Sequence, residues 1–196
     1  MWKDKILDLV KDFEHPAWGF SHFTRIHELS LKLAKEQSLV VDYDSLYAAA
    51  YLHDIGAFKP YSQKGRDHSD VAIEICDEIL ASTDFPLDKI PLVKEIIKSH
   101  MFYAEVGGNI ESKIFHDADT LDFLGVIGIT RLLSIVGIAD WTPNLKSAID
   151  LIEKFSKDLP HKLHTELAKE MGKYRQKEMR KFLVKLKNET NNLVLI

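Results

Sequence analysis

Cysteine is nearly absent from this chain, and its scarcity limits the kinds of metal or redox site that the chain can build. Cys76 is the single cysteine among 196 residues, so no disulfide can form within the chain and no site of four thiolates can be assembled. A metal ion must therefore be held by histidine and carboxylate side chains. Such ligands suit first-row divalent ions and Mg²⁺-like ions.

An excess of positive charge and a long apolar run are also missing. The 26 basic and 30 acidic residues give a net charge of −4, which argues against duplex nucleic acid as a partner, although a local basic pocket can still hold a small anion. No apolar run approaches a membrane-spanning helix, and acidic residues interrupt the start of the chain where a signal peptide needs an apolar stretch. We therefore expect a cytoplasmic protein with no membrane partner.

Strand-like alternation of apolar and polar residues is absent as well. Apolar residues instead recur every three to four positions, which predicts helices, and glycine and proline mark local turns rather than linkers between domains. We expect an all-α fold, a helical bundle of one domain over residues 1–196. The expected helices cover residues 3–14, 22–37, 43–53, 67–81, 87–100, 110–117, 119–138, 144–157 and 161–188.

The most informative pattern present is the pair His53-Asp54, which stands at the polar end of an apolar helix. Three alanines, 48–50, precede the pair and allow close helix packing, and Gly56 follows it and ends the helix. The dipole at a helix C-terminus favours a cation. The pair is thus a candidate for metal binding, and the alternative is a C-terminal capping pair with no metal.

Further candidate ligands lie before and after this pair. His22 begins a helix after Ser21, and its alternative role is to occupy the first turn of a capped helix. Asp117, Asp119 and Asp122 lie in an apolar stretch, residues 114–125. Because a buried carboxylate is costly unless it is paired or metal-bound, we expect at least one of them to have a cation partner. A capping box without a metal is the alternative for this segment.

Together these residues resemble the HD superfamily of metal-dependent phosphohydrolases, whose pattern is a histidine, a His-Asp pair and a distant aspartate. The pattern falls on His22, His53, Asp54 and Asp119. The last is preferred because the Ala-Asp-x-Leu core of the family motif coincides with residues 118–121. The sequence is most similar to the branch of small, stand-alone bacterial HD hydrolases. The resemblance covers about residues 18–140, and helices at about 144–188 are expected to pack on that core.

The resemblance implies a divalent ion between central helices, held by the four matched residues. Mn²⁺, Fe²⁺, Zn²⁺ and Mg²⁺ all fit this description. His68 and His100 lie where some family members bind a second ion. Their alternatives are contact with phosphate, a role as general acid, or a purely structural place at a helix end. Asp117 and His116 are candidates to accept a proton beside the metal.

Three cationic side chains are candidates to bind the substrate phosphate, namely Arg25, Lys59 and Arg131. An arginine among apolar neighbours needs an anionic partner, and for Arg25 this partner can instead be a structural carboxylate. Many HD enzymes have a lysine soon after the His-Asp-x-Gly motif. This chain departs from that pattern, because Ala57 and Phe58 lie between the motif and Lys59.

The implied activity is that of a metal-dependent phosphohydrolase, which releases phosphate or pyrophosphate from a nucleotide or small phosphorylated metabolite. Aromatic side chains expected either to stack on a base or to belong to the core are Phe58, Tyr61, Phe102, Tyr103 and Trp141. A catalytically idle nucleotide-binding sensor is the alternative from another class, and a di-iron HD oxygenase is a third. The sequence leaves open whether the chain forms a homo-oligomer.

Overall fold

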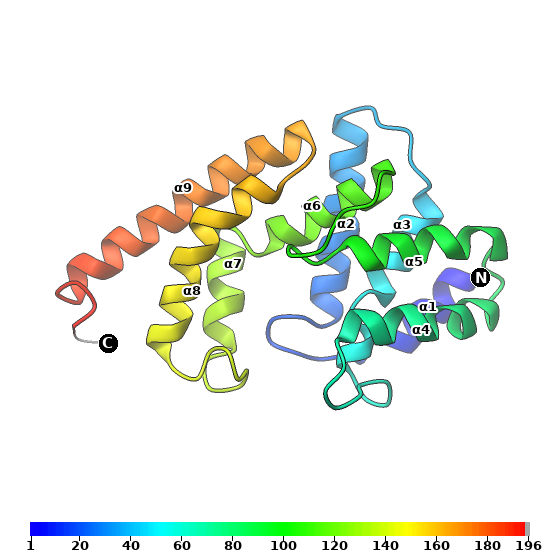
Figure 1. Cartoon of the computed structure of the whole chain (residues 1–196), viewed down its shortest axis with the longest axis horizontal. Coiled ribbons are helices and arrows are strands. Elements are labelled where there is room, and N and C mark those ends of the chain that lie inside the picture. The colour runs from blue at the N-terminus through cyan, green and yellow to red at the C-terminus, as the bar shows by residue number, and fades with distance from the viewer. Residues whose placement is uncertain (195–196) are drawn as a thin grey trace.

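The computed structural model describes residues 1–194, which contain helices and no strand, so the predicted all-α fold is confirmed. Figure 1 shows the helices in chain order. The α-helices are α1 (Trp2–Val10), α2 (Phe20–Glu36), α3 (Tyr43–Leu52), α4 (His68–Ala81), α5 (Ile90–Ser99), α6 (Ile110–Asp122), α7 (Gly125–Ser134), α8 (Leu145–Asp158) and α9 (Glu166–Glu189). Three short 3₁₀ helices are η1 (Ile55–Ala57), η2 (Leu87–Lys89) and η3 (Leu159–Lys162).

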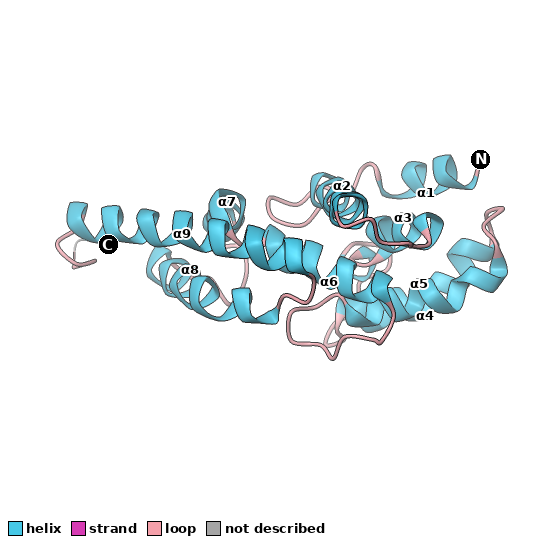
Figure 2. Cartoon of the chain, turned by 90° about the horizontal axis from the view of Figure 1, so that it is seen from above, coloured by secondary structure: helices cyan, strands magenta, loops and turns pink. Residues whose placement is uncertain are grey.

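The helices form two groups with α6 between them. Helices α1 to α5 lie on one side and α7 to α9 on the other, and the two groups lie end to end in both views (Figures 1 and 2). Helix α6 packs against α2 and α5 of the first group and against α7 and α9 of the second. Within residues 1–194, none of the helices combines the length and the apolar character needed to span a bilayer.

Helix α3 is the most deeply buried element of the first group. All of its residues from Ser45 to Leu52 are buried. The Asp42 side chain accepts a hydrogen bond from the Ser45 amide and so caps the start of the helix. The three alanines 48–50 are fully inaccessible to solvent, which permits the close approach of α2 and α5. The helix therefore delivers His53, its C-terminal cap, into the interior of the fold.

The expected break between helices 110–117 and 119–138 is wrong. Helix α6 continues to Asp122, and the break follows at Phe123 and Leu124. The polar residues near 117–119 do not interrupt the helix, because their side chains are buried with polar partners. The chain instead turns at Gly125, which has φ of +74°, a left-handed conformation that favours glycine.

The other predicted boundaries differ mainly at helix ends. The first helix stops at Val10, four residues earlier than expected. The segment predicted as 161–188 is divided into η3 and α9, and Thr165 lies at the N-cap of α9. Pro86 directly precedes η2, and Pro160 lies in the first turn of η3. At both positions the missing amide proton costs no intrahelical hydrogen bond.

Candidate metal centre

His22 and His53 point one ring nitrogen each at the same place. His22 lies in the first turn of α2, and its Nε2 atom is 3.2 Å from Nε2 of His53. The Nδ1–H group of His53 donates to the carbonyl oxygen of Ala50 at 2.9 Å, and Nδ1 of His22 donates to the Asp122 carboxylate at 2.8 Å. In the neutral form of each ring, these bonds assign the proton to Nδ1, so that both Nε2 atoms present lone pairs. Two lone pairs at this separation repel each other, so the geometry fits a cation between them.

Two carboxylates complete this arrangement. Oδ1 of Asp119 lies 3.4 Å from Nε2 of His22. Oδ2 of Asp54 lies 3.6 Å from the same nitrogen and 3.5 Å from Nε2 of His53. All four side chains are buried, since no more than 7% of any of these residues is exposed. The structure thus brings together the four residues that match the family pattern, and their role as ligands stays a prediction.

A second group of side chains converges on the other oxygen of Asp54. Oδ1 of Asp54 is 3.1 Å from Nε2 of His68 and 3.6 Å from Nε2 of His100. Nδ1 of His100 donates to the Ile97 carbonyl at 2.6 Å, and its Nε2 is buried without a hydrogen-bond partner among residues 1–194. Asp54 therefore directs one oxygen toward each of two groups, and the second group also fits a cation.

Burial and charge set the protonation of these groups in the metal-free protein. Burial lowers the pKa of His53 to about 4, so this ring is neutral at pH 7 and its Nε2 is free to bind a metal. Burial also opposes the charged forms of Asp54 and His68, but their mutual contact outweighs it. The surrounding histidines hold the pKa of Asp54 well below its usual value, and Asp54 raises the pKa of His68 to about 9. Asp54 is thus available as a carboxylate.

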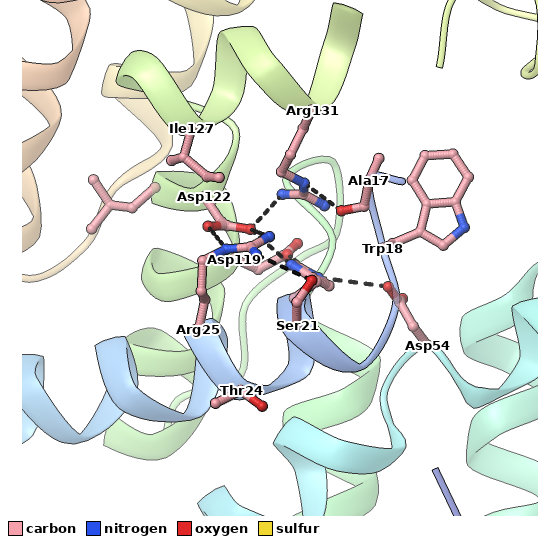
Figure 3. Close-up of polar contacts among 12 residues, drawn as sticks. Ala17, Trp18, Ser21, Thr24, Arg25, Asp54, Asp119, Asp122, Ile127 and Arg131 are labelled. Atoms are coloured by element: carbon pink, nitrogen blue, oxygen red, sulfur yellow. Dashed lines mark hydrogen bonds and ion pairs between the residues drawn. The ribbon is translucent and has the colours of Figure 1, made fainter. Parts of the chain in front are cut away.

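Asp122 links the candidate ligands to two arginines. It lies three residues after Asp119 on the same face of α6, and it accepts the Nδ1–H of His22. Arg25 donates to both of its oxygens at 2.9 Å, and Nη1 of Arg131 lies 2.9 Å from Oδ2 (Figure 3). The guanidinium of Arg25 is therefore directed at a structural carboxylate, which was the alternative for this residue. The sequence marked Asp122 only as one of three carboxylates in residues 114–125, and its contacts with His22 and the two arginines were not predicted.

His116 and Asp117 face away from the two ligand groups. The Asp117 carboxylate accepts three hydrogen bonds of 2.7 Å, from the amide of His164 and from the amide and hydroxyl of Thr165. His116 donates from Nδ1 to the Ser99 carbonyl at 2.9 Å. Neither residue lines the cavity beside the candidate ligands. Their placement argues against the expected role in proton transfer, because Asp117 instead holds the start of α9 against α6.

A cavity of about 440 Å³ opens beside both ligand groups. His22, Asp54, His68 and Asp119 line it on the side of the first helix group. The remaining lining residues are mostly apolar. Trp18 precedes α2 and Ala57 ends η1, and the others come from the connections after α5 and α6 and from the second helix group: Met101, Phe102, Tyr103, Phe123, Arg131, Trp141, Leu151, Lys154 and Phe155. The site is therefore polar on one wall and largely aromatic on the other.

Several other sequence-based candidates can be placed relative to this cavity. Arg131 lines it, whereas Lys59 lies exposed in the loop after η1 and does not. Of the five aromatic candidates, Phe102, Tyr103 and Trp141 line the cavity. Phe58 stacks on Phe13 instead, with ring centroids 4.7 Å apart. Trp18 and Lys154 were not anticipated, because no motif marks either residue.

Residues 19–145 match the sequence model of the HD domain family. The chain belongs to the HD domain family. The match includes all six histidine and aspartate residues of the two ligand groups and ends where α8 begins. The predicted resemblance to HD proteins is thus confirmed, and the His and Asp clusters suit the divalent metals of that family.

Solved structures from bacteria share the fold across nearly the whole chain. A structural-genomics target from Lactobacillus plantarum is 22% identical, with a TM-score of 0.73 and coverage of 97% of both chains. Bacillus subtilis YpgQ, solved in complex with ADP, is 21% identical, with a TM-score of 0.71 over 95% of this chain and 97% of that chain. A predicted HD superfamily hydrolase from an uncultured Thermotogales bacterium is 24% identical, with a TM-score of 0.66 over 96% of this chain and 90% of that one. No curated protein matches the chain.

Proposed function

We propose that this HD protein is a metal-dependent phosphohydrolase that acts on a nucleotide or a small phosphorylated metabolite. The observation that carries the proposal is the position of Asp54, which turns one carboxylate oxygen toward each of two buried ligand groups. A cavity large enough for a small molecule adjoins both groups. Membership of a family that includes hydrolases supports the same activity.

The proposed metal centre uses only side chains that already converge. One ion is held by His22, His53, Asp54 and Asp119, and Asp54, His68 and His100 hold a second ion. A divalent metal lowers the pKa of a bound water and offsets negative charge on a phosphoryl group. The carbonyls of Ala50 and Ile97 keep the rings of His53 and His100 oriented, because each accepts the Nδ1 proton of its histidine.

The cavity suits a substrate that combines an anionic group with an aromatic body. Phe102 and Trp141 line the wall away from the carboxylates and provide flat apolar surface on which a base can stack. Arg131 adds positive charge near the metal centre, where it offsets part of the charge of Asp122 and Asp119. YpgQ, which shares this fold, was solved with ADP, and this supports a nucleotide as the ligand here.

The proposal is tested by product release from nucleotides. The purified protein is loaded with Mn²⁺ and assayed for phosphate and pyrophosphate with nucleoside mono-, di- and triphosphates. Asp54→Ala is expected to reduce turnover to background and to lower the bound metal measured by mass spectrometry, because both ligand groups lose an oxygen. Asp8→Ala, which changes an exposed carboxylate in α1, is the matched control and is expected to retain both properties.

Two outcomes would contradict the proposal. An Asp54→Ala variant that stays active and metal-loaded would show that the centre is wrongly placed. A wild-type protein that binds metal and nucleotide but releases no product from any phosphorylated compound would favour the sensor alternative.

A further inference from the structure

Helix α8 forms the wall of the cavity that faces the candidate metal centre. Leu151, Lys154 and Phe155 of this helix line the cavity, and α8 belongs to the opposite helix group from α2, α3 and α4 (Figure 1). Phe155 is only 6% exposed, and its ring packs edge-on against Phe102 at 5.3 Å and Phe123 at 5.6 Å. The wall is therefore held by core packing. It also lies beyond the end of the HD match at residue 145.

Lys154 is a cationic residue of this cavity that has no ion-pair partner within residues 1–194. The other lining residue with a permanent positive charge is Arg131, which is 3% exposed and is engaged by Asp122 and by the Ala17 carbonyl. Lys154 is exposed and makes no ion pair or side-chain hydrogen bond with any residue in the range 1–194. An incoming anion therefore has one lysine ammonium in the cavity whose donors are unused.

The other lysines of α8 behave differently. Lys146 lies 3.4 Å from Asp150, and Lys157 donates to Glu153 at 2.9 Å, each across one helical turn. Lys154 has Asp150 and Asp158 at the same spacing on either side, yet it pairs with neither. Its side chain contributes to the cavity lining instead of to the charged surface of the helix.

We propose that Lys154 binds a second anionic group of the substrate, while the reacting phosphoryl group lies at the metal centre on the opposite wall. In this arrangement α8 selects nucleoside di- and triphosphates over monophosphates. The inference rests on the proposed function, because it takes the His and Asp clusters as the site of reaction. A lysine ammonium is a compact point charge that suits a phosphate group, and a monophosphate held at the metals has no second anion to reach it.

The test compares Lys154→Gln with Lys146→Gln in the metal-loaded protein. Both variants lose one positive charge from α8, but Lys146 does not line the cavity. Lys154→Gln is expected to raise KM for ATP about tenfold, as the loss of one charge-assisted hydrogen bond does, and to leave kcat for ATP and KM for AMP unchanged. Lys146→Gln is expected to match the wild type with both nucleotides. An equal effect of Lys154→Gln on ATP and AMP, or no effect on either, would overturn the proposal.

A binding measurement separates this inference from the proposed function. If the wild type hydrolyses neither nucleotide, the dissociation constants of ATP and AMP are measured by calorimetry on the metal-loaded protein. Weaker binding of ATP alone in Lys154→Gln would support the role of Lys154 even though the proposed activity had failed. Unchanged binding of ATP would reject that role whatever the activity of the wild type.

Discussion

At the scale of single residues, Asp122 is the carboxylate that links the candidate metal centre to two arginines. One carboxylate faces His22, Arg25 and Arg131, all within 2.9 Å. These partners hold the pKa of Asp122 far below its ordinary value, although burial opposes ionisation. A permanently charged carboxylate behind His22 fixes the tautomer that leaves Nε2 free and raises the basicity of that nitrogen. We therefore expect Asp122 to act on the metal through His22.

Asp122→Asn is expected to lower the affinity for Mn²⁺ about 10–100-fold, because the amide holds His22 less firmly and removes a buried negative charge. The measurement is calorimetric titration of Mn²⁺ into metal-free protein, at a temperature at which circular dichroism shows the variant to be folded. Asp84→Asn, at an exposed residue paired with Lys5, controls for the loss of charge. Wild-type affinity in a less stable Asp122→Asn protein would mean that the residue has a structural role alone.

Sequence alone could select the residues of the centre but not the direction in which each side chain points. His22, His53, Asp54 and Asp119 stand out because a motif sets them apart. The partner of His22, Asp122, is 100 residues away in the chain, so the contact depends on how α2 packs against α6. Lys154 belongs to no motif, and only the packing of α8 brings it to the cavity.

At the scale of secondary-structure elements, the continuity of α6 decides which residues face the metal. If the helix ended at residue 117, as the sequence suggested, Asp119 and Asp122 would start a new helix. In the uninterrupted helix, Asp119 and Asp122 share a face, and Asp117 lies on another face toward His164. The polar residues of this segment indicated a helix break, because intrinsic helix propensity takes no account of the tertiary contacts that their buried side chains make. The true turn depends on Gly125.

Gly125→Ala is expected to lower the free energy of unfolding by about 1–2 kcal/mol, because an alanine is strained at the φ of +74° found here. An added Cβ would also lie 3.0 Å from the side chain of Arg175 in α9. Urea unfolding followed by circular dichroism measures the change. Gly108→Ala is the matched control, because that glycine has no left-handed φ and no atom near the new methyl group. Equal stability of the two variants would contradict this account of the turn between α6 and α7.

At the scale of the whole molecule, the candidate centre joins helices that are far apart in the chain. The first ligand group draws on α2, on the end of α3 and on α6, and the second adds α4 and the end of α5. The all-α class was predictable, because the periodicity of apolar residues is a local property of the sequence. The convergence of the ligands could not be predicted in the same way, because it depends on the packing of five helices. A bound ion would cross-link those helices in the folded state alone, because the unfolded chain does not hold the ligands together.

Metal binding is therefore expected to raise the thermal midpoint of unfolding. At a free Mn²⁺ concentration of roughly 100 times Kd, linkage contributes about 2.7 kcal/mol, and for a chain of this length this corresponds to a shift of about 5–10 °C. Calorimetric scans with Mn²⁺ and with a chelator give the difference directly. His53→Ala removes a ligand from α3 and is expected to lose most of the shift, whereas His161→Ala, in the short helix η3 outside both ligand groups, is expected to keep it. A centre that joins these helices cannot lose a buried imidazole ligand without losing affinity for Mn²⁺. An equal shift of the thermal midpoint in wild type and His53→Ala would therefore place the stabilising ion elsewhere.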